Sequence, residues 1–143
     1  MLAKARESCY TLLIAPTGGG KTLAGFLPSL VDLDDRSGAK NGLHTLYISP
    51  LKALTTDIAR NLRTPIEEIG LDIRVETRTG DTPQNRRQRQ RANPPDMLLT
   101  TPESLALLLS YPDASAMFQG LDTVIIDELH ALAGAKRGQL DNR

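Results

Sequence analysis

The stretch TLLIAPTGGGKTLAGFL, from Thr11 to Leu27, decides the fold. It places an apolar run of strand length, three consecutive glycines and a Lys-Thr pair directly before an apolar pattern of helical period. Successive backbone N–H groups in a glycine-rich turn that leads into a helix form a concave set of donors that binds phosphate. Side chains in place of Gly18, Gly19 and Gly20 would obstruct that approach. The stretch therefore predicts a strand, a polyphosphate-binding loop and a helix, in that order.

The Lys-Thr pair adds the chemistry that a nucleoside triphosphate needs. Lys21 can reach the outer phosphates, and the Thr22 hydroxyl can take a place on Mg²⁺. The general pattern G-x-x-x-x-G-K-S/T is matched here with Ala15 in the first position. We therefore predict ATP and Mg²⁺ as cofactors. The predicted nucleotide-binding residues are Pro16, Thr17, Gly18, Gly19, Gly20, Lys21 and Thr22.

A second stretch, TVIIDELH from Thr123 to His130, ends an apolar run with two adjacent carboxylates. At the end of a buried strand Asp127 can hold Mg²⁺ through its water shell, while Glu128 can polarise the water that attacks the terminal phosphate. Taken alone, such a pair is more often a solvated strand end or a helix cap. Downstream of a phosphate-binding loop the catalytic interpretation is favoured, so Thr22 and Asp127 are the predicted metal ligands.

Apolar runs of strand length alternate with segments of helical period, which predicts an α/β fold with a parallel sheet covered by helices on both faces. The predicted strands are Thr11–Ala15, His44–Ser49, Leu71–Thr77, Asp96–Thr100 and Thr123–Asp127. Most are nearly continuous apolar runs, as expected of strands buried on both faces. Leu71–Thr77 instead alternates apolar and polar residues, which predicts a strand near the sheet edge. We expect Pro28 and Pro65 to kink or end the helices in which they lie.

The length and composition limit the classes of protein to which the chain can belong. The chain has 143 residues, 40% of them hydrophobic, and Lys plus Arg and Asp plus Glu each total 17. One domain is expected, and any nucleic-acid site has to be local because the formal net charge is zero. The single cysteine, Cys9, predicts a reducing compartment. No leader pattern or membrane-length apolar segment is found, so a cytoplasmic location without membrane association is expected.

Several motifs together resemble superfamily 2 helicases of the DEAD/DEAH-box (DExH) type, whose phosphate loop reads A-P-T-G-x-G-K-T and whose second motif reads D-E-x-H. The stretches SPLKALTTD, TGD and TTPESL are similar to the nucleic-acid-contacting motifs of that group. Sequences of the large helicase-related branch, especially of its bacterial ligase-associated members, are similar to three stretches of this chain: LYISPLKAL, RVETRTGDTP and DELHALAGAKRG. The resemblance covers almost the whole chain and implies a RecA-like P-loop NTPase fold.

The resemblance also implies an activity and the residues that perform it. The implied activity is ATP-driven translocation on single-stranded DNA, three-prime to five-prime, with duplex unwinding in DNA repair. RNA stays open as an alternative partner, and a DNA ligase or nuclease of a repair operon is a further expected partner. The implied catalytic residues are Lys21, Asp127, Glu128 and His130, of which His130 couples the ATP site to neighbouring motifs. The implied nucleic-acid contacts are Pro50, Lys52, Thr79, Gly80, Thr100, Thr101 and Pro102.

Several of these residues can also be interpreted as the first residues of two helices. Ser49 with Pro50 fits the N-cap and first residue of one helix, and Thr100 or Thr101 with Pro102 fits the start of another. Helix N-termini bind phosphates without reading bases, which suits a protein that moves along a strand. In isolation, however, such residues are more often ordinary caps.

Two further features have plainer interpretations. The run RRQRQR, Arg86–Arg91, is predicted either to touch a nucleic-acid backbone or to form a solvated helix face. His44 opens a predicted strand and is expected to be structural.

The family carries segments that this chain does not match. They are a glutamine-containing segment before the phosphate loop, the third motif and the second motor domain. We expect residues 1–143 to be a partial first RecA-like domain, truncated at both ends, with the second RecA-like domain absent. Three alternatives stay open: the first domain of an ATP-dependent helicase or translocase, a nucleotide-binding module without motor activity, and an inactive fragment.

Overall fold

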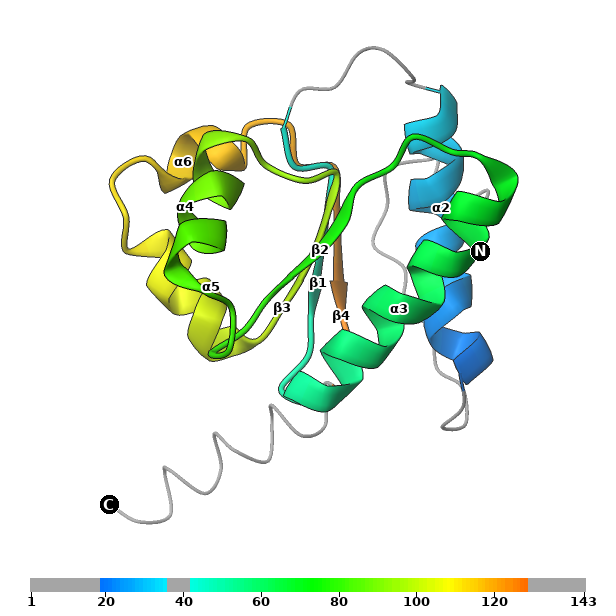
Figure 1. The fold of residues 1–143 in the computed structure, drawn as a ribbon, viewed down its shortest axis with the longest axis horizontal. Helices are drawn as coiled ribbons and strands as arrows, with labels where there is room; N and C mark the ends of the chain where they lie inside the picture. The colour runs from blue at the N-terminus through cyan, green and yellow to red at the C-terminus, as the bar shows by residue number, and fades with distance from the viewer. Residues whose placement is uncertain (1–18, 36–41, 129–143) are drawn as a thin grey trace.

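A computed structural model describes residues 19–35 and 42–128, with side chains from residue 24 onward (Figure 1). The strands are β1 (Thr45–Ile48), β2 (Val75–Arg78), β3 (Met97–Thr100) and β4 (Thr123–Ile126). The helices are α2 (Gly19–Asp35), α3 (Lys52–Ile69), α4 (Gln84–Ala92), α5 (Pro102–Leu109) and α6 (Ala114–Met117). The predicted α/β class is confirmed. The predicted strand Thr11–Ala15 and Cys9 lie outside the described residues.

The four strands form one parallel sheet in the order β2-β3-β1-β4. Their carboxyl ends are level, because Ile48 is in register with both Thr100 and Ile126, and Arg78 is in register with Thr100. We call the edge at which these residues lie the carboxyl edge, and the opposite edge, where the strands begin, the amino edge. Each connection that leaves a strand therefore starts at the carboxyl edge.

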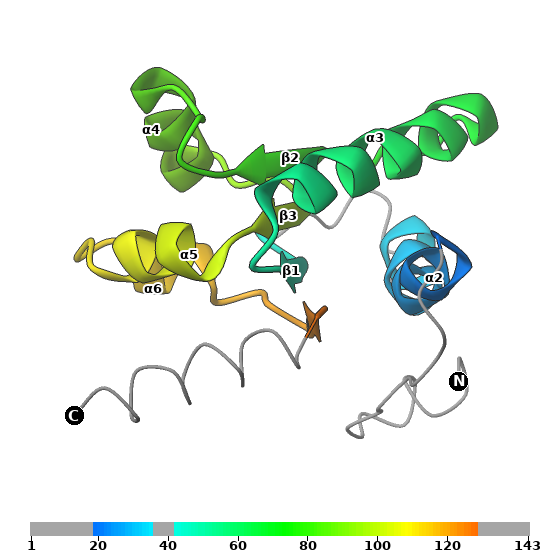
Figure 2. The same ribbon diagram turned by 90° about the horizontal axis from the view of Figure 1, so that it is seen from below.

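Helices cover both faces of the sheet, as predicted (Figure 2). On one face α2 and α3 enclose a core whose buried members are Phe26, Tyr47, Ile58, Ala59, Leu62, Ile66, Val75, Met97 and Leu99. On the other face α5 and α6 enclose a second core of Leu43, Leu46, Leu98, Leu108 and Met117. β1 and β3 lie between both cores, which explains why their sequences are apolar without alternation.

The outer strand β2 confirms the predicted edge position, but it begins at Val75 and not at Leu71. Its neighbour β3 starts at Met97, directly opposite Val75, so earlier residues have no strand beside them. The Arg74 amide instead donates to the Asp96 carboxylate at 2.8 Å. Leu71 and Ile73 pack against the first core without strand pairing.

Pro28 and Pro65, which the sequence predicts to kink or end their helices, do not end them. Both α2 and α3 continue beyond their prolines. Proline removes one helical hydrogen bond, at a cost of about 3 kcal/mol. Side chains on both sides of each proline pack against the first core, which offsets that cost. α3 ends at Gly70, whose positive φ of 81° suits glycine.

No helix in the described part of the chain is long and apolar enough to cross a membrane.

Candidate functional site

Four of the predicted motifs meet at the carboxyl edge. Ser49 and Pro50 follow β1, Thr79 follows β2, Thr101 follows β3, and Asp127 follows β4. In Figure 1 the first turn of α2 and the start of α3 lie at the same end of the molecule as the arrowhead of β4. In open parallel sheets ligands bind outside the carboxyl ends of the strands. The fold thus brings the predicted nucleotide and nucleic-acid residues to one edge.

Asp127 is held rigidly at the end of β4. Its side chain is buried, with 7% of the residue exposed, and its amide donates to the Ile48 carbonyl at 2.9 Å. The Tyr47 hydroxyl donates to Oδ2 at 2.8 Å, and the Glu128 amide donates to Oδ1 at 2.9 Å. These contacts orient the carboxylate.

Tyr47 is the buried partner that orients Asp127. Burial raises the pKa of the Tyr47 hydroxyl far above its usual range, and its hydrogen bond to the Asp127 carboxylate adds to the rise. The hydroxyl is therefore a permanent donor at physiological pH. No pattern in the sequence separates this tyrosine from an ordinary core residue, so sequence reasoning missed it.

Glu128 has a backbone conformation that is uncommon for its residue type. Its φ of 54° is the only positive value at a non-glycine residue within 19–35 and 42–128. A left-handed conformation costs such a residue about 1–2 kcal/mol. Strained residues of this kind gather at functional sites. The position fits a residue that acts on water beside a metal-binding neighbour.

The segment after β1 differs from the expected helix start. α3 begins at Lys52, and its N-cap is Leu51, which has extended dihedral angles and no side-chain cap. The predicted N-cap Ser49 and first residue Pro50 are therefore wrong by two positions. The Ser49 hydroxyl instead accepts a hydrogen bond from the Leu51 amide at 3.2 Å, which forms a turn just before the helix. The helix N-terminus still lies at the carboxyl edge.

Lys52 connects two of the motifs. Its Nζ lies 2.7 Å from Asp81 Oδ2, although both side chains are largely exposed. The pair joins the segment after β1 to the segment after β2, which are separated by β3 in the sheet. An exposed pair contributes little to stability, so Lys52 can exchange this partner for a phosphate at low cost.

The segment Thr79–Thr82 is a compact turn. The Thr79 amide donates to the Thr82 hydroxyl at 2.9 Å, and the Asp81 amide donates to the Thr79 hydroxyl at 3.2 Å. Arg87 of α4 donates to the Thr79 carbonyl at 2.8 Å and to the Gly80 carbonyl at 3.3 Å. Arg87 thus stabilises the turn. The sequence predicts a nucleic-acid contact or a solvated face for the arginine run, and it does not predict this contact with the Thr79–Thr82 turn.

The two threonines after β3 have different surroundings. Thr101 is the N-cap of α5 and accepts from the Ser104 amide at 3.4 Å, with Pro102 as the first helical residue, as predicted. Thr100 is fully buried, and its hydroxyl donates to the Arg78 carbonyl at 2.7 Å. The Thr100 hydroxyl therefore serves the fold, and the N-terminus of α5 faces the carboxyl edge.

Two other arginines of the run Arg86–Arg91 also contact the protein itself. Arg89 pairs with Glu76, and Arg91 lies 3.8 Å from the centre of the Tyr111 ring. Arg86 is exposed. The run is mainly a structural face that attaches α4 to its neighbours.

The phosphate-loop residues are described only in part. Gly19, Gly20, Lys21 and Thr22 form the first turn of α2, while Pro16, Thr17, Gly18 and His130 lie outside the described residues. A helix start and an oriented carboxylate at the same edge fit a polyphosphate and Mg²⁺, since phosphate binds at helix N-termini and Mg²⁺ prefers carboxylate and hydroxyl oxygens.

Three comparisons relate the chain to known proteins. It matches the family model described as DEAD/DEAH box helicase over residues 2–142. It is 48% identical over 151 residues to the Lhr helicase/uracil glycosylase of Escherichia coli, covering 94% of this chain and 10% of that protein. It is 43% identical over 145 residues to the ATP-dependent helicase Lhr-Core of Methanocaldococcus jannaschii, covering 92% of this chain and 17% of that protein.

A solved structure gives the same result. The structure of Mycobacterium smegmatis helicase Lhr bound to ssDNA and AMP-PNP superposes with a TM-score of 0.78 at 48% identity. The match covers 92% of this chain and 18% of that chain. The chain thus spans less than a fifth of the length of each of these three relatives.

Proposed function

The chain belongs to the DEAD/DEAH box helicase family, and from that membership we propose that it forms the ATP-binding first RecA-like domain of an ATP-dependent helicase or translocase. The similarity to the large helicase-related (Lhr) branch is confirmed by its relatives. The observation that carries the proposal is the meeting of four motifs and the start of α2 at the carboxyl edge. Single-stranded DNA is the proposed partner, since the similar Mycobacterium smegmatis structure is described as bound to it.

The nucleotide half of the proposed site is built from α2 and the end of β4. Gly18 to Thr22 would surround the phosphates with backbone donors, and Lys21 would neutralise phosphate charge. Thr22 and Asp127 would hold Mg²⁺, which when bound withdraws charge from the terminal phosphates. Tyr47 keeps Asp127 oriented through its hydrogen bond. Glu128 orients the attacking water and accepts its proton, and His130 couples this step to the neighbouring motifs.

The nucleic-acid half is built from the connections after β1, β2 and β3. The N-termini of α3 and α5 and the turn at Thr79 and Gly80 offer backbone donors and hydroxyls to phosphates. Lys52 adds a positive charge at the same surface. None of these groups reads a base edge, which suits movement along any sequence. Pro50, Thr100, Thr101 and Pro102 shape the connections.

Coupling of the two halves requires more than this domain. We propose that hydrolysis drives movement only when a second RecA-like domain closes over the nucleotide. The cytoplasmic location and the association with a DNA ligase or nuclease of a repair operon stay predictions of the sequence resemblance.

The test is ATP hydrolysis with and without single-stranded DNA, in the protein that contains both motor domains. We expect DNA to stimulate hydrolysis, and Lys21→Ala to lower the stimulated rate by about 100-fold or more because phosphate charge is no longer neutralised. ATP binding with no hydrolysis and no response to DNA would support a nucleotide-binding module in place of a motor. Absence of ATP-dependent stabilisation would refute the nucleotide site itself.

A further inference from the structure

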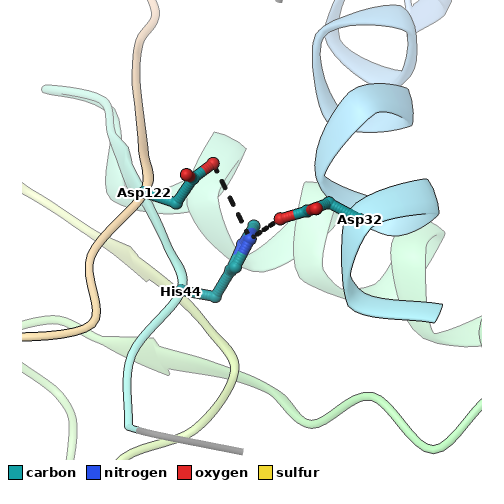
Figure 3. Close-up of side chains that lie close together, drawn as sticks. All are labelled: Asp32, His44 and Asp122. Atoms are coloured by element: carbon teal, nitrogen blue, oxygen red, sulfur yellow. Dashed lines mark hydrogen bonds and ion pairs between the residues drawn. The ribbon is translucent and has the colours of Figure 1, made fainter. Parts of the chain in front are cut away.

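A second cluster of polar side chains lies at the amino edge, far from the motifs. Asp32 comes from the last turns of α2, His44 directly precedes β1, and Asp122 directly precedes β4 (Figure 3). One ligand atom from each residue lies within 4.8 Å of the other two. His44 is buried, with 4% exposed, and its ring points between the two carboxylates.

The spacing of the three side chains is close to that of a tetrahedral metal site. His44 Nε2 lies 2.6 Å from Asp32 Oδ2 and 3.8 Å from Asp122 Oδ2. Ligand bonds of about 2.0 Å in a tetrahedral zinc site place neighbouring ligand atoms about 3.3 Å apart. Opening the first distance and closing the second, each by less than about 1 Å, would bring both His44 pairs to this spacing, and the Asp32 and Asp122 ligand oxygens lie within 4.8 Å of each other. Side-chain rotation alone can supply such shifts.

Two of the three residues, His44 and Asp122, make further hydrogen-bonding contacts that hold them in place. His44 Nδ1 lies 2.7 Å from the Thr45 hydroxyl oxygen, and the Thr123 hydroxyl donates to Asp122 Oδ2 at 3.0 Å. The Asp122 amide donates to the His44 carbonyl at 2.9 Å, so the two backbones are also joined. Metal-binding imidazoles commonly use their second nitrogen in this way, which fixes the ring and its tautomer.

The kinds of ligand atom in the cluster indicate which cation it suits. One nitrogen and two carboxylate oxygens suit a transition metal more than Mg²⁺, which prefers oxygen ligands alone.

We propose that Asp32, His44 and Asp122 form a binding site for a divalent transition-metal cation of the Zn²⁺ class, with a fourth position for water. The metal joins the carboxyl-terminal end of α2 to the starts of β1 and β4. The nucleotide site lies at the other end of α2, about 20 Å away along the helix, because Asp32 follows Gly19 by 13 residues. The metal therefore has a structural role and is separate from the nucleotide-bound Mg²⁺.

The test is calorimetric titration of the metal-stripped full chain with ZnCl₂, in a large excess of Mg²⁺ and without nucleotide. We expect one zinc ion per chain at micromolar affinity or tighter, together with a higher thermal unfolding midpoint. His44→Gln and Asp122→Asn should each weaken binding by about tenfold or more. Asp57→Asn, which alters an exposed carboxylate on α3, is the matched control and should leave zinc binding unchanged.

Further measurements keep the proposal open to refutation. If His44→Gln does not fold, Asp122→Asn decides, because that carboxylate is half exposed and its loss leaves the core intact. Asp127→Asn should retain the zinc ion, and zinc X-ray absorption should show nitrogen and oxygen ligands only. Three results would overturn the proposal: no saturable binding at micromolar zinc, binding unaffected by Asp122→Asn, or sulfur among the ligands.

Discussion

The two edges of the sheet differ in how their polar groups are assembled. At the carboxyl edge the groups come from short contiguous motifs, and turns and helix starts present them, as at Thr79 and Thr101. At the amino edge the carboxylates of Asp32 and Asp122 meet at the buried ring of His44, and the three residues are far apart in the sequence. Backbone donors at the first edge suit phosphates, whereas side-chain ligands at the second suit a cation. Changes at one edge should therefore leave the chemistry of the other edge intact.

Among the variants that should affect one edge and not the other, Glu128→Gln is expected to have the largest effect. The amide cannot accept a proton from the attacking water, so ATP hydrolysis should fall by about 100-fold or more. ATP binding should persist because Asp127 and the phosphate loop are unchanged. Single-turnover hydrolysis and nucleotide binding, measured on the protein with both motor domains, check this. Unchanged turnover would show that Glu128 is not the base.

The next largest effect is expected from removing the hydrogen bond that orients Asp127. Tyr47→Phe removes the hydroxyl that donates to Oδ2 and should lower the free energy of unfolding by about 1–3 kcal/mol. Because the pKa of Tyr47 is raised above its ordinary value of 10.0, the folded state favours the protonated hydroxyl. Its contribution is thus complete below pH 10 and declines as the pH rises above 10. Denaturant unfolding of both proteins across this range should show the difference shrinking only at high pH; a difference that grows there would contradict the assignment.

A matched pair of threonines sharpens the comparison. Thr101→Ala removes the N-cap of α5 at the carboxyl edge and should cost about 1 kcal/mol of stability, together with a loss of affinity for single-stranded DNA. Thr123→Ala lies at the amino edge beside Asp122 and should leave DNA affinity unchanged. Fluorescence anisotropy with a labelled oligonucleotide measures both. Equal losses of DNA affinity would break the proposed division between the edges.

The smallest effect is expected at the exposed pair of Lys52 and Asp81. Lys52→Ala removes one phosphate contact and should weaken DNA binding by about three- to tenfold at low salt, with a smaller slope of affinity against salt. Asp81→Asn releases Lys52 from its 2.7 Å partner and should strengthen binding by about twofold. Salt titrations of both variants check the opposite signs. A salt slope that Lys52→Ala does not change would place the DNA elsewhere.

The fold was largely predictable because its signals are local. Three of the four strands in the described residues are predicted by apolar runs and β2 by an alternating pattern, and parallel pairing follows from the alternation of strands with helices. The errors arose where a neighbour decides the boundary. β2 starts only where Met97 of β3 is available for pairing, and packing carries α2 and α3 through Pro28 and Pro65.

The site was predictable only where its residues are adjacent in the sequence. Asp127 and Glu128 form a recognisable pair, but Tyr47, which orients Asp127, lies 80 residues earlier. His44 was expected to be a structural residue, because nothing near it in the sequence indicates that Asp32 and Asp122 approach its ring. Contacts of this kind depend on the strand order, which the sequence does not display.

The most direct test of the central claim, that nucleotide and DNA bind at the carboxyl edge, is hydrogen–deuterium exchange with Mg-AMP-PNP and single-stranded DNA. We predict slower exchange at residues 49–52, 79–81, 101–103 and 127–128, with no change at residues 43–44 and 121–123. Protection at the amino edge alone, or no protection at the carboxyl edge, would contradict the claim.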